Sequence, residues 1–235
     1  MTHGDQVGLF DLRFELPSVC AQSVRTGTAA IGLVPVIEVF RQNLEVVADV
    51  GIASDGAVRS IFLVHKKPMR EIRSVALDSS SRTSVALVRI LLAEEYGVVA
   101  DEHEVSPRLT RMLEGADAAV LIGDPALQLD IESCPYGILD LGEAWKHWSG
   151  LPMVYAVWAG QAPEISSKAG DILHQSYEFG KANIEGIIQQ EGRARSVPDE
   201  LARRYLTNHI RYELDATMFA GMREFKRLAR KHGLV

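Results

Sequence analysis

The sequence of 235 residues is poor in the residues that mark several common classes of protein. It has 2 cysteines, Cys20 and Cys134, which lie far apart and belong to no zinc-binding spacing. Its 31 acidic residues outnumber its 25 basic ones, which disfavours a general nucleic-acid binder. No apolar run approaches the roughly 18 residues of a membrane span. We therefore expect no metal, no nucleic-acid partner and no membrane partner.

Familiar catalytic and targeting motifs are also missing. The sequence has no GxSxG, no HExxH and no phosphate-binding GxxxxGK[ST]. The first residues have neither the basic start nor the apolar centre of a secretory signal, so we expect a cytoplasmic protein. The composition, 47% hydrophobic and 24% charged, is that of an ordinary globular protein. No cofactor is predicted, and the oligomeric state is left open.

Helical and strand-like segments alternate through the first two thirds of the chain. This order predicts an α/β fold with a mostly parallel sheet and crossover helices. From residue 165 onward the sequence favours helices, with one long amphipathic helix expected over residues 204–233. The predicted helices cover residues 17–27, 36–43, 81–97 and 106–115, and the predicted strands cover residues 28–36, 44–54, 59–68, 73–78, 117–124 and 152–160.

Two stretches resemble each other and predict two similar lobes. RTGTAAIGLVP, residues 25–35, and LEGADAAVLIGDP, residues 113–125, both contain a helix end, a glycine, an Ala-Ala pair, a buried strand and a proline. Coincidence among alanine-rich strands is the alternative. With two lobes, residues 1–70 and 155–235 form lobe one and residues 71–154 form lobe two. Ligands of open α/β sheets bind at strand ends, so we expect a cleft between the lobes.

The stretch LDSSSRTSVALVRILL, residues 77–92, places an unusual number of hydroxyl groups at the start of a helix. The first four N–H groups of a helix have no partner within it, and the helix dipole adds positive charge there. With hydroxyl donors nearby, such a site suits a carboxylate. The alternative is ordinary capping beside a solvated arginine. The residues in question are Ser79, Ser80, Ser81, Arg82, Thr83 and Ser84.

Other polar or shape-giving residues follow predicted strands and are expected to face the same cleft. Ser54 lies in the turn of GIASDGAVRS, and Gly123 and Asp124 follow the strand of DAAVLIGD. Asp124 alternatively caps the next turn. Val34 and Pro35 lie at the matching strand end of the other lobe and supply only shape and backbone groups. We expect these residues to complete the binding site.

Four stretches together resemble the chorismate dehydratase family of the futalosine route to menaquinone. They are GIASDGAVRSIFL, LDSSSRTSVALVRILL, DAAVLIGDPAL and ILDLGEAWKHWSGLPMVYAVWAG, in that order. The resemblance runs from about residue 17 to about residue 160 and continues more loosely to the end. It implies a two-lobed fold like that of the type II periplasmic binding proteins, used as an intracellular enzyme. The resemblance departs at the start: the sequence begins at MTHGDQVG, a point past the first strand and Leu-Asn loop that are expected of the family.

The resemblance also implies a reaction, the conversion of chorismate to 3-[(1-carboxyvinyl)oxy]benzoate and water. This would make the protein a carbon–oxygen lyase that needs no cofactor. Substrate binding is expected at Val34, Pro35, Ser54, Ser81, Arg82, Thr83, Ser84 and Gly123, with Asp124 near the leaving hydroxyl as the catalytic candidate and no side chain assigned as the base. Two alternatives remain: a non-catalytic two-lobed binder of small carboxylates, and the related cyclase that acts on dehypoxanthine futalosine.

Overall fold

The computed structural model describes residues 7–78, 81–162, 165 and 168–235, and its strands form two sheets. The first sheet has the order β1-β8-β2-β9 and the second has the order β5-β4-β6-β3-β7. The strands are β1 (Ile31–Pro35), β2 (Glu45–Ser54), β3 (Ile61–His65), β4 (Ser74–Leu77), β5 (Asp101–Glu104), β6 (Ala118–Ile122), β7 (Gly137–Asp140), β8 (Met153–Gly160) and β9 (Arg211–Glu213).

The prediction of a mostly parallel sheet is wrong. Strand β8 pairs antiparallel with both β1 and β2, and β9 pairs antiparallel with β2. In the second sheet β4 runs parallel to β5 and β6, whereas β3 runs antiparallel to β6 and β7. The reason is topological: the chain leaves the first sheet after β2 and returns as β8, so β8 runs against the strands it joins.

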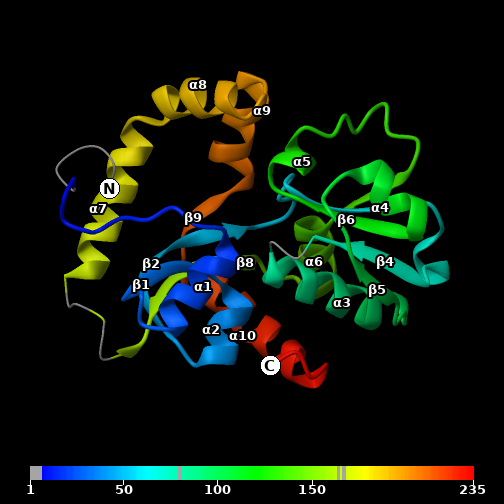
Figure 1. Ribbon diagram of the computed structural model, residues 1–235, viewed down its shortest axis with the longest axis horizontal. Coiled ribbons are helices and arrows are strands. Elements are labelled where there is room, and N and C mark those ends of the chain that lie inside the picture. Colours follow the sequence, from blue (N-terminus) through cyan, green and yellow to red (C-terminus); the bar gives the residue numbers. More distant parts are fainter. Residues whose placement is uncertain (1–6, 79–80, 163–164, 166–167) are drawn as a thin grey trace.

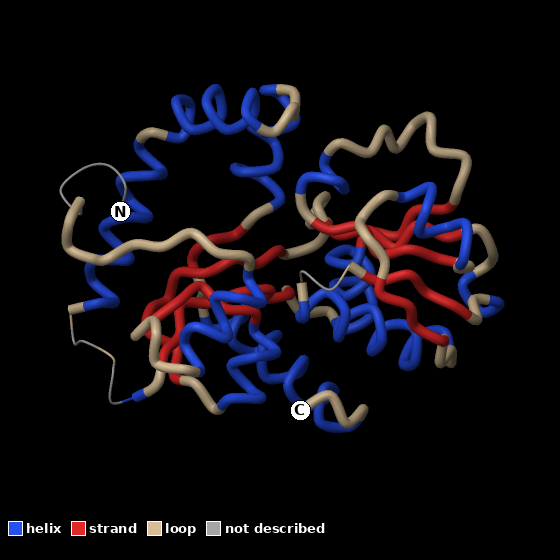
Figure 2. The backbone as a smooth tube through the Cα atoms, in the orientation of Figure 1, coloured by secondary structure: helices blue, strands red, loops and turns tan. Residues whose placement is uncertain are grey.

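The helices form one layer beneath both sheets, an arch above the first sheet and a smaller group, α4 and α5, on the upper side of the second (Figures 1 and 2). The arch consists of α7, α8 and α9, and the lower layer contains α2, α3, α6 and α10. The helices are α1 (Pro17–Arg25), α2 (Val36–Gln42), α3 (Arg82–Tyr96), α4 (Leu109–Gly115), α5 (Asp124–Leu127), α6 (Leu141–Ser149), α7 (Ala169–Ala182), α8 (Ile184–Ala194), α9 (Asp199–Arg204) and α10 (Ala216–Lys231), with short turns η2 (Met69–Glu71) and η4 (Tyr205–His209).

The single long helix expected over residues 204–233 is wrong. The chain forms the π-helical turn η4, then β9, and only then α10. Asp215 starts α10, because its carboxylate accepts hydrogen bonds from the backbone N–H groups of Thr217 and Met218, each at 2.8 Å. The amphipathic pattern continues through η4, β9 and α10, and Asp215 marks the boundary between β9 and α10.

The two sheets share one hydrophobic core. Buried side chains of α2, α3, α6 and α10 belong to the same cluster as those of β1, β4, β6 and β8. Trp145 of α6 packs edge-on against Phe225 of α10 at 6.0 Å between ring centroids. Its indole N–H donates to the carbonyl of Pro152 at 3.0 Å. Helix α10 approaches this loop so closely that a Cβ on Gly221 would lie 2.0 Å from the same carbonyl oxygen.

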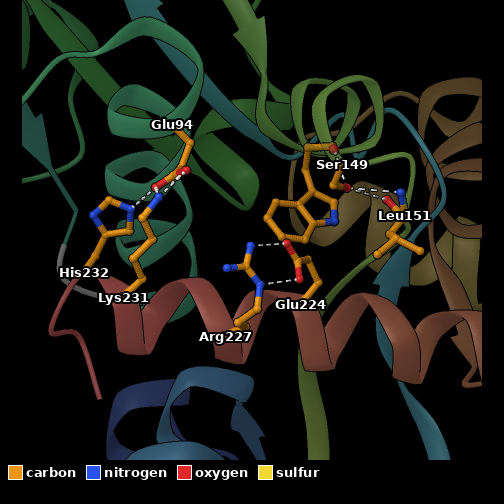
Figure 3. A network of polar contacts seen from close by, with 8 residues as sticks. Glu94, Ser149, Leu151, Glu224, Arg227, Lys231 and His232 are labelled. Atoms are coloured by element: carbon orange, nitrogen blue, oxygen red, sulfur yellow. Dashed lines mark hydrogen bonds and ion pairs between the residues drawn. The ribbon is translucent and has the colours of Figure 1, made fainter.

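The C-terminal end of α10 is tied to α3 by charged side chains (Figure 3). Glu94 of α3 accepts hydrogen bonds from Lys231 and His232. The hydrogen bond from Lys231, opposed by partial burial and helped by His232, lowers the pKa of Glu94. Arg41 of α2 also reaches this end of the chain, donating to the carbonyl of Leu234 at 2.9 Å. The last residues thereby connect helices that lie beneath different sheets.

The chain changes sheet at residues 55–60 and again at residues 141–152. The two similar stretches contribute β1 to the first sheet and β6 to the second. The division into domains at residues 70 and 155 stays a prediction, although β3 already belongs to the second sheet. Among the described residues, no helix is long and apolar enough to cross a membrane.

Candidate functional site

The starts of α2 and α3 meet where the two sheets adjoin. Strand β1 ends at Pro35, which precedes the first turn of α2. The backbone N–H of Ile37 in that turn donates to the hydroxyl of Thr83 in the first turn of α3, at 3.4 Å. The structure therefore brings Val34 and Pro35 close in the fold to Arg82, Thr83 and Ser84, as the sequence predicts. We call the place formed by residues 34–38 and 81–84 the α2/α3 joint.

The hydroxyl groups of the joint bond to one another and to α2. The hydroxyls of Ser81 and Ser84 lie 2.9 Å apart. Ser81 occupies the N-cap position of α3, yet its side chain makes no capping hydrogen bond. Thr83 and Ser84 are 1% and 0% exposed, whereas Ser81 and Arg82 are partly open to solvent. Ser79 and Ser80 lie outside the described residues.

A buried carboxylate, absent from the predicted site, organises the charge at the joint. Glu38 of α2 is 3% exposed and accepts hydrogen bonds from Arg41 at 2.8 Å and Gln42 at 2.9 Å. The guanidinium of Arg82 lies 3.2 Å from the same carboxylate. Burial alone would raise the pKa of Glu38, but hydrogen bonds from Gln42, Arg41 and Arg82 lower it overall. The only sequence signal was a lone glutamate in the apolar run VIEVF.

Ser54 lies where the chain leaves the first sheet, and its hydroxyl is already engaged. It is fully buried, donates to the carbonyl of Gly56 at 2.9 Å and lies 3.0 Å from the hydroxyl of Tyr155. Burial raises the pKa of Tyr155, so that hydroxyl stays protonated. A Cβ on Gly142 would lie within 2.8 Å of the carbonyl of Gly56 and both hydroxyls. These contacts hold the two segments that connect the sheets, residues 55–60 and 141–152, against each other.

Asp140 joins the same two segments through backbone hydrogen bonds. Its carboxylate accepts from the N–H groups of Val58 and Arg59 at 3.0 and 2.7 Å. It also accepts from Gly142 and Glu143, at 2.9 and 3.1 Å, and so caps α6. Sequence reasoning missed Asp140, although the pattern DLGE, with an acidic residue three positions after the cap, is typical of a helix start.

Gly123 and Asp124 lie at the start of α5, which adjoins the segment of residues 55–60. Gly123 has a φ of +69°, and its N–H donates to the carbonyl of Ser60 at 2.8 Å. The carboxylate of Asp124 is 49% exposed and lies 3.7 Å from the guanidinium of Arg195. The structure thus distributes the predicted residues over three places: the joint, the first change of sheet and the start of α5. Their roles stay predictions.

Two cavities lie against the first sheet. The larger, of about 790 Å³, is bounded by β2, β9, α7, α8 and η4 and includes Leu33 and Asp55. The smaller, of about 610 Å³, lies between residues 10–15 and β1. Trp158 lines both cavities, but none of the predicted site residues lines either one. The predicted residues lie at strand ends and helix starts, whereas the cavities follow the sheet face and its edge.

Within the described part of the chain, no group of three or more His, Cys, Asp or Glu is placed to hold a metal ion.

A family described as menaquinone biosynthesis matches residues 5–231 of the sequence. The chain belongs to this family. A curated relative, the chorismate dehydratase of Thermus thermophilus, is 28% identical over 201 residues, which cover 79% of this chain and 73% of the relative. These two findings confirm the resemblance on which the sequence-based expectations rested.

Solved structures establish the fold class of this family member. A protein from Archaeoglobus fulgidus superposes with a TM-score of 0.72 at 17% identity, covering 95% of this chain and 86% of the other. The periplasmic aliphatic sulphonate binding protein SsuA from Escherichia coli gives a TM-score of 0.63 at 15% identity, covering 93% and 75%. The alkanesulfonate-binding protein SsuA from Xanthomonas axonopodis pv. citri, bound to MOPS, gives 0.58 at 13% identity, covering 95% and 82%. The chain therefore has a periplasmic-binding-protein-like α/β fold, as predicted.

Proposed function

We propose that this protein is a chorismate dehydratase, a hydro-lyase that converts chorismate to 3-[(1-carboxyvinyl)oxy]benzoate and water. One observation carries the proposal: the relative aligned over 79% of the chain is named for this activity and fits the role of the matched family. Within the family resemblance, the stretch SRTS, residues 81–84, looks like that of the dehydratase rather than that of the related cyclase. It lies at the α2/α3 joint, where the start of α3 and Arg82 supply positive charge.

The reaction places modest demands on the protein. A proton leaves one ring carbon and a hydroxyl leaves its neighbour, and the ring becomes aromatic, which supplies driving force. The protein must hold a dianion in a reactive orientation, keep water away and stabilise developing charge. A site of backbone N–H groups, hydroxyls and one arginine would orient the dianion and stabilise its developing charge. In this proposal no side chain serves as the base, and a carboxylate of the substrate takes the proton.

Each predicted residue receives a role in this proposal. Ser81, Arg82 and the first N–H groups of α3 hold one substrate carboxylate. Thr83 and Ser84 are buried and already paired, so they fix the start of α3. The substrate ring lies near Val34, Pro35 and Ser54, and Gly123 and Asp124 face the leaving hydroxyl.

A product assay tests the proposal. The full chain is incubated with chorismate, and chromatography with mass detection follows the loss of one water to give an aromatic enol ether. Boiled protein serves as the control for spontaneous breakdown of chorismate. Enzyme-dependent formation of the enol ether is the expected result. No product above the control, with dehypoxanthine futalosine consumed instead, would identify the cyclase.

One observation favours a second candidate function, a non-catalytic binder of small carboxylates. No described acid–base pair of side chains lies at the α2/α3 joint, where Glu38 is held by three cationic or amide side chains. Under this alternative, calorimetry would detect chorismate binding while the product assay stays at the level of the control. The two measurements therefore separate the candidates.

A further inference from the structure

Glu38 is a charged side chain placed where charges are costly. Removing an ionised carboxylate from water costs several kcal/mol unless hydrogen bonds and opposite charges compensate. Here the compensation is complete: one oxygen accepts from Arg41, the other accepts from Gln42, and Arg82 approaches the first. A buried carboxylate with this set of partners stays ionised and holds its position.

The two arginines that share Glu38 differ in what surrounds them. Arg41 lies on the same helix as Glu38 and also donates to the carbonyl of Leu234. Arg82 is the first residue of α3, and its side chain is 41% exposed. The contact between Glu38 and Arg82 therefore spans two helices, and it lies next to the hydrogen bond from Ile37 to Thr83.

The cluster carries one more positive than negative charge, because a single carboxylate faces two guanidinium groups. A guanidinium has five N–H donors in a rigid fork, more than one carboxylate oxygen can use. An arginine fixed at one end of its fork is oriented for a second carboxylate, because less rotamer freedom is lost on binding. Ser81, half-buried beside it, adds a hydroxyl.

We propose that Glu38 is a positioning residue for substrate binding: it holds the guanidinium of Arg82 at the start of α3 in the orientation that receives a substrate carboxylate. The identity of the ligand in this inference rests on the proposed function, whereas the orientation of Arg82 by Glu38 is independent of it. Glu38 itself does not touch the substrate.

The first test measures binding of chorismate by calorimetry in the wild type, Glu38→Gln and Glu38→Asp. Loss of orientation weakens binding about threefold to tenfold, the contribution of one oriented hydrogen bond. Glu38→Asp keeps the charge but shortens the reach, so it is expected to weaken binding too. If Glu38 were only a counter-charge, Glu38→Gln would tighten binding and Glu38→Asp would leave it unchanged. Either of those results would overturn the proposal.

The control breaks another ion pair of α3, one that lies away from the joint. Arg89 of α3 is bonded to Glu102 of β5, away from the joint. Glu102→Gln is expected to leave chorismate affinity unchanged. A double-mutant cycle adds the readout that a structural role would not produce: in the Arg82→Gln background, Glu38→Gln should have no further effect. An additive loss would show that Glu38 acts by another route.

The second test needs no substrate. In protein labelled with ¹⁵N-arginine, the Nε–H signal of Arg82, assigned by its loss in Arg82→Gln, reports the order of the side chain on the picosecond to nanosecond timescale. We expect an ordered Nε–H in the wild type and a mobile one in Glu38→Gln. An unchanged order parameter would overturn the positioning role. If the wild type fails to bind chorismate while Arg82 loses order in Glu38→Gln, the proposed function is wrong and the positioning role stands.

Discussion

Asp140 and Arg59 connect the two segments by which the chain passes between its sheets. The carboxylate of Asp140, at the end of β7, accepts the backbone N–H of Arg59 at 2.7 Å. Arg59 has a φ of +64°, and its guanidinium donates to the carbonyls of Ala126 and Leu129 at 2.8 and 3.2 Å. One residue of the first passage is thereby fixed to the start of the second passage and to the loops of the second sheet.

We expect Asp140→Ala to lower the free energy of unfolding by about 3 kcal/mol, because hydrogen bonds to a charged acceptor contribute about 1.5–3 kcal/mol and several are lost together. Urea unfolding at neutral pH measures the change. Asp130→Ala is a suitable control, since the carboxylate of Asp130 accepts hydrogen bonds from Glu132 and Ser133 within its own exposed loop. Equal effects of the two substitutions would contradict the connecting role of Asp140.

Gly142→Ala is expected to destabilise the protein by about 1–3 kcal/mol, as overpacking does. The new Cβ would lie 2.6 Å from the carbonyl oxygen of Gly56 and 2.7 Å from the hydroxyl of Tyr155. Gly186→Ala is the matched control, because nothing lies within 4 Å of a Cβ there and α8 gains helix propensity. The melting temperature should therefore fall for Gly142→Ala and rise for Gly186→Ala. A change in the same direction for both variants would show that a methyl group fits between Gly142, Gly56 and Tyr155.

Leu127→Ala tests the contact between α5 and the arch. Leu127 belongs to a small buried cluster with Ile188, Val197 and Ala202. Its truncation is expected to cost about 2–3 kcal/mol, the lower part of the range for a leucine in a core. Hydrogen exchange in α8 should accelerate in the variant. Val99→Ala, at a side chain 91% exposed, should change stability by less than about 0.5 kcal/mol. Unchanged exchange in α8 would contradict a stabilising contact.

The tie between Glu94 and the end of α10 predicts a pH dependence of stability. The pKa of Glu94 is lowered in the folded protein, chiefly by the hydrogen bond from Lys231. Its contribution is therefore fully present above the unfolded-state pKa of about 4.3 and is lost as the pH falls through the lower folded value. Glu94→Gln should destabilise the protein more at pH 7 than at pH 3. Urea unfolding at both values measures this, and an equal effect at both would be inconsistent with it.

Most elements of the fold were predictable because their signals are local. The helix of residues 82–96 follows a hydroxyl-rich start and ends at Gly97, which has a φ of +68°. The buried strands were evident from short apolar runs between turn residues. Strand direction was not predictable in this way, because it depends on β8 returning from the second sheet. The prediction of one long helix was wrong because the helix cap at Asp215 divides a continuous amphipathic pattern.

The candidate site was only partly predictable. Residues 81–84 and Val34–Pro35 meet in the structure because each set lies at the start of a helix that follows a strand. Glu38 was missed because its contact with Arg82 joins residues far apart in the chain. The DLGE pattern marks Asp140 as a helix start, but not as an acceptor for the distant N–H groups of Val58 and Arg59. Thr83 and Ser84 illustrate a further limit: composition shows that hydroxyls are present, but not that they are buried and bonded to one another.

We propose that the start of α3 binds a carboxylate of chorismate. Calorimetric titration of chorismate into the wild type, Arg82→Gln and Arg89→Gln isolates this contact, because both arginines lie on α3 but only Arg82 lies at the α2/α3 joint. We predict that Arg82→Gln weakens binding about tenfold or more, as expected for loss of a charge-assisted hydrogen bond, and that Arg89→Gln binds like the wild type. Equal affinities for all three proteins would show that Arg82 does not bind the substrate carboxylate.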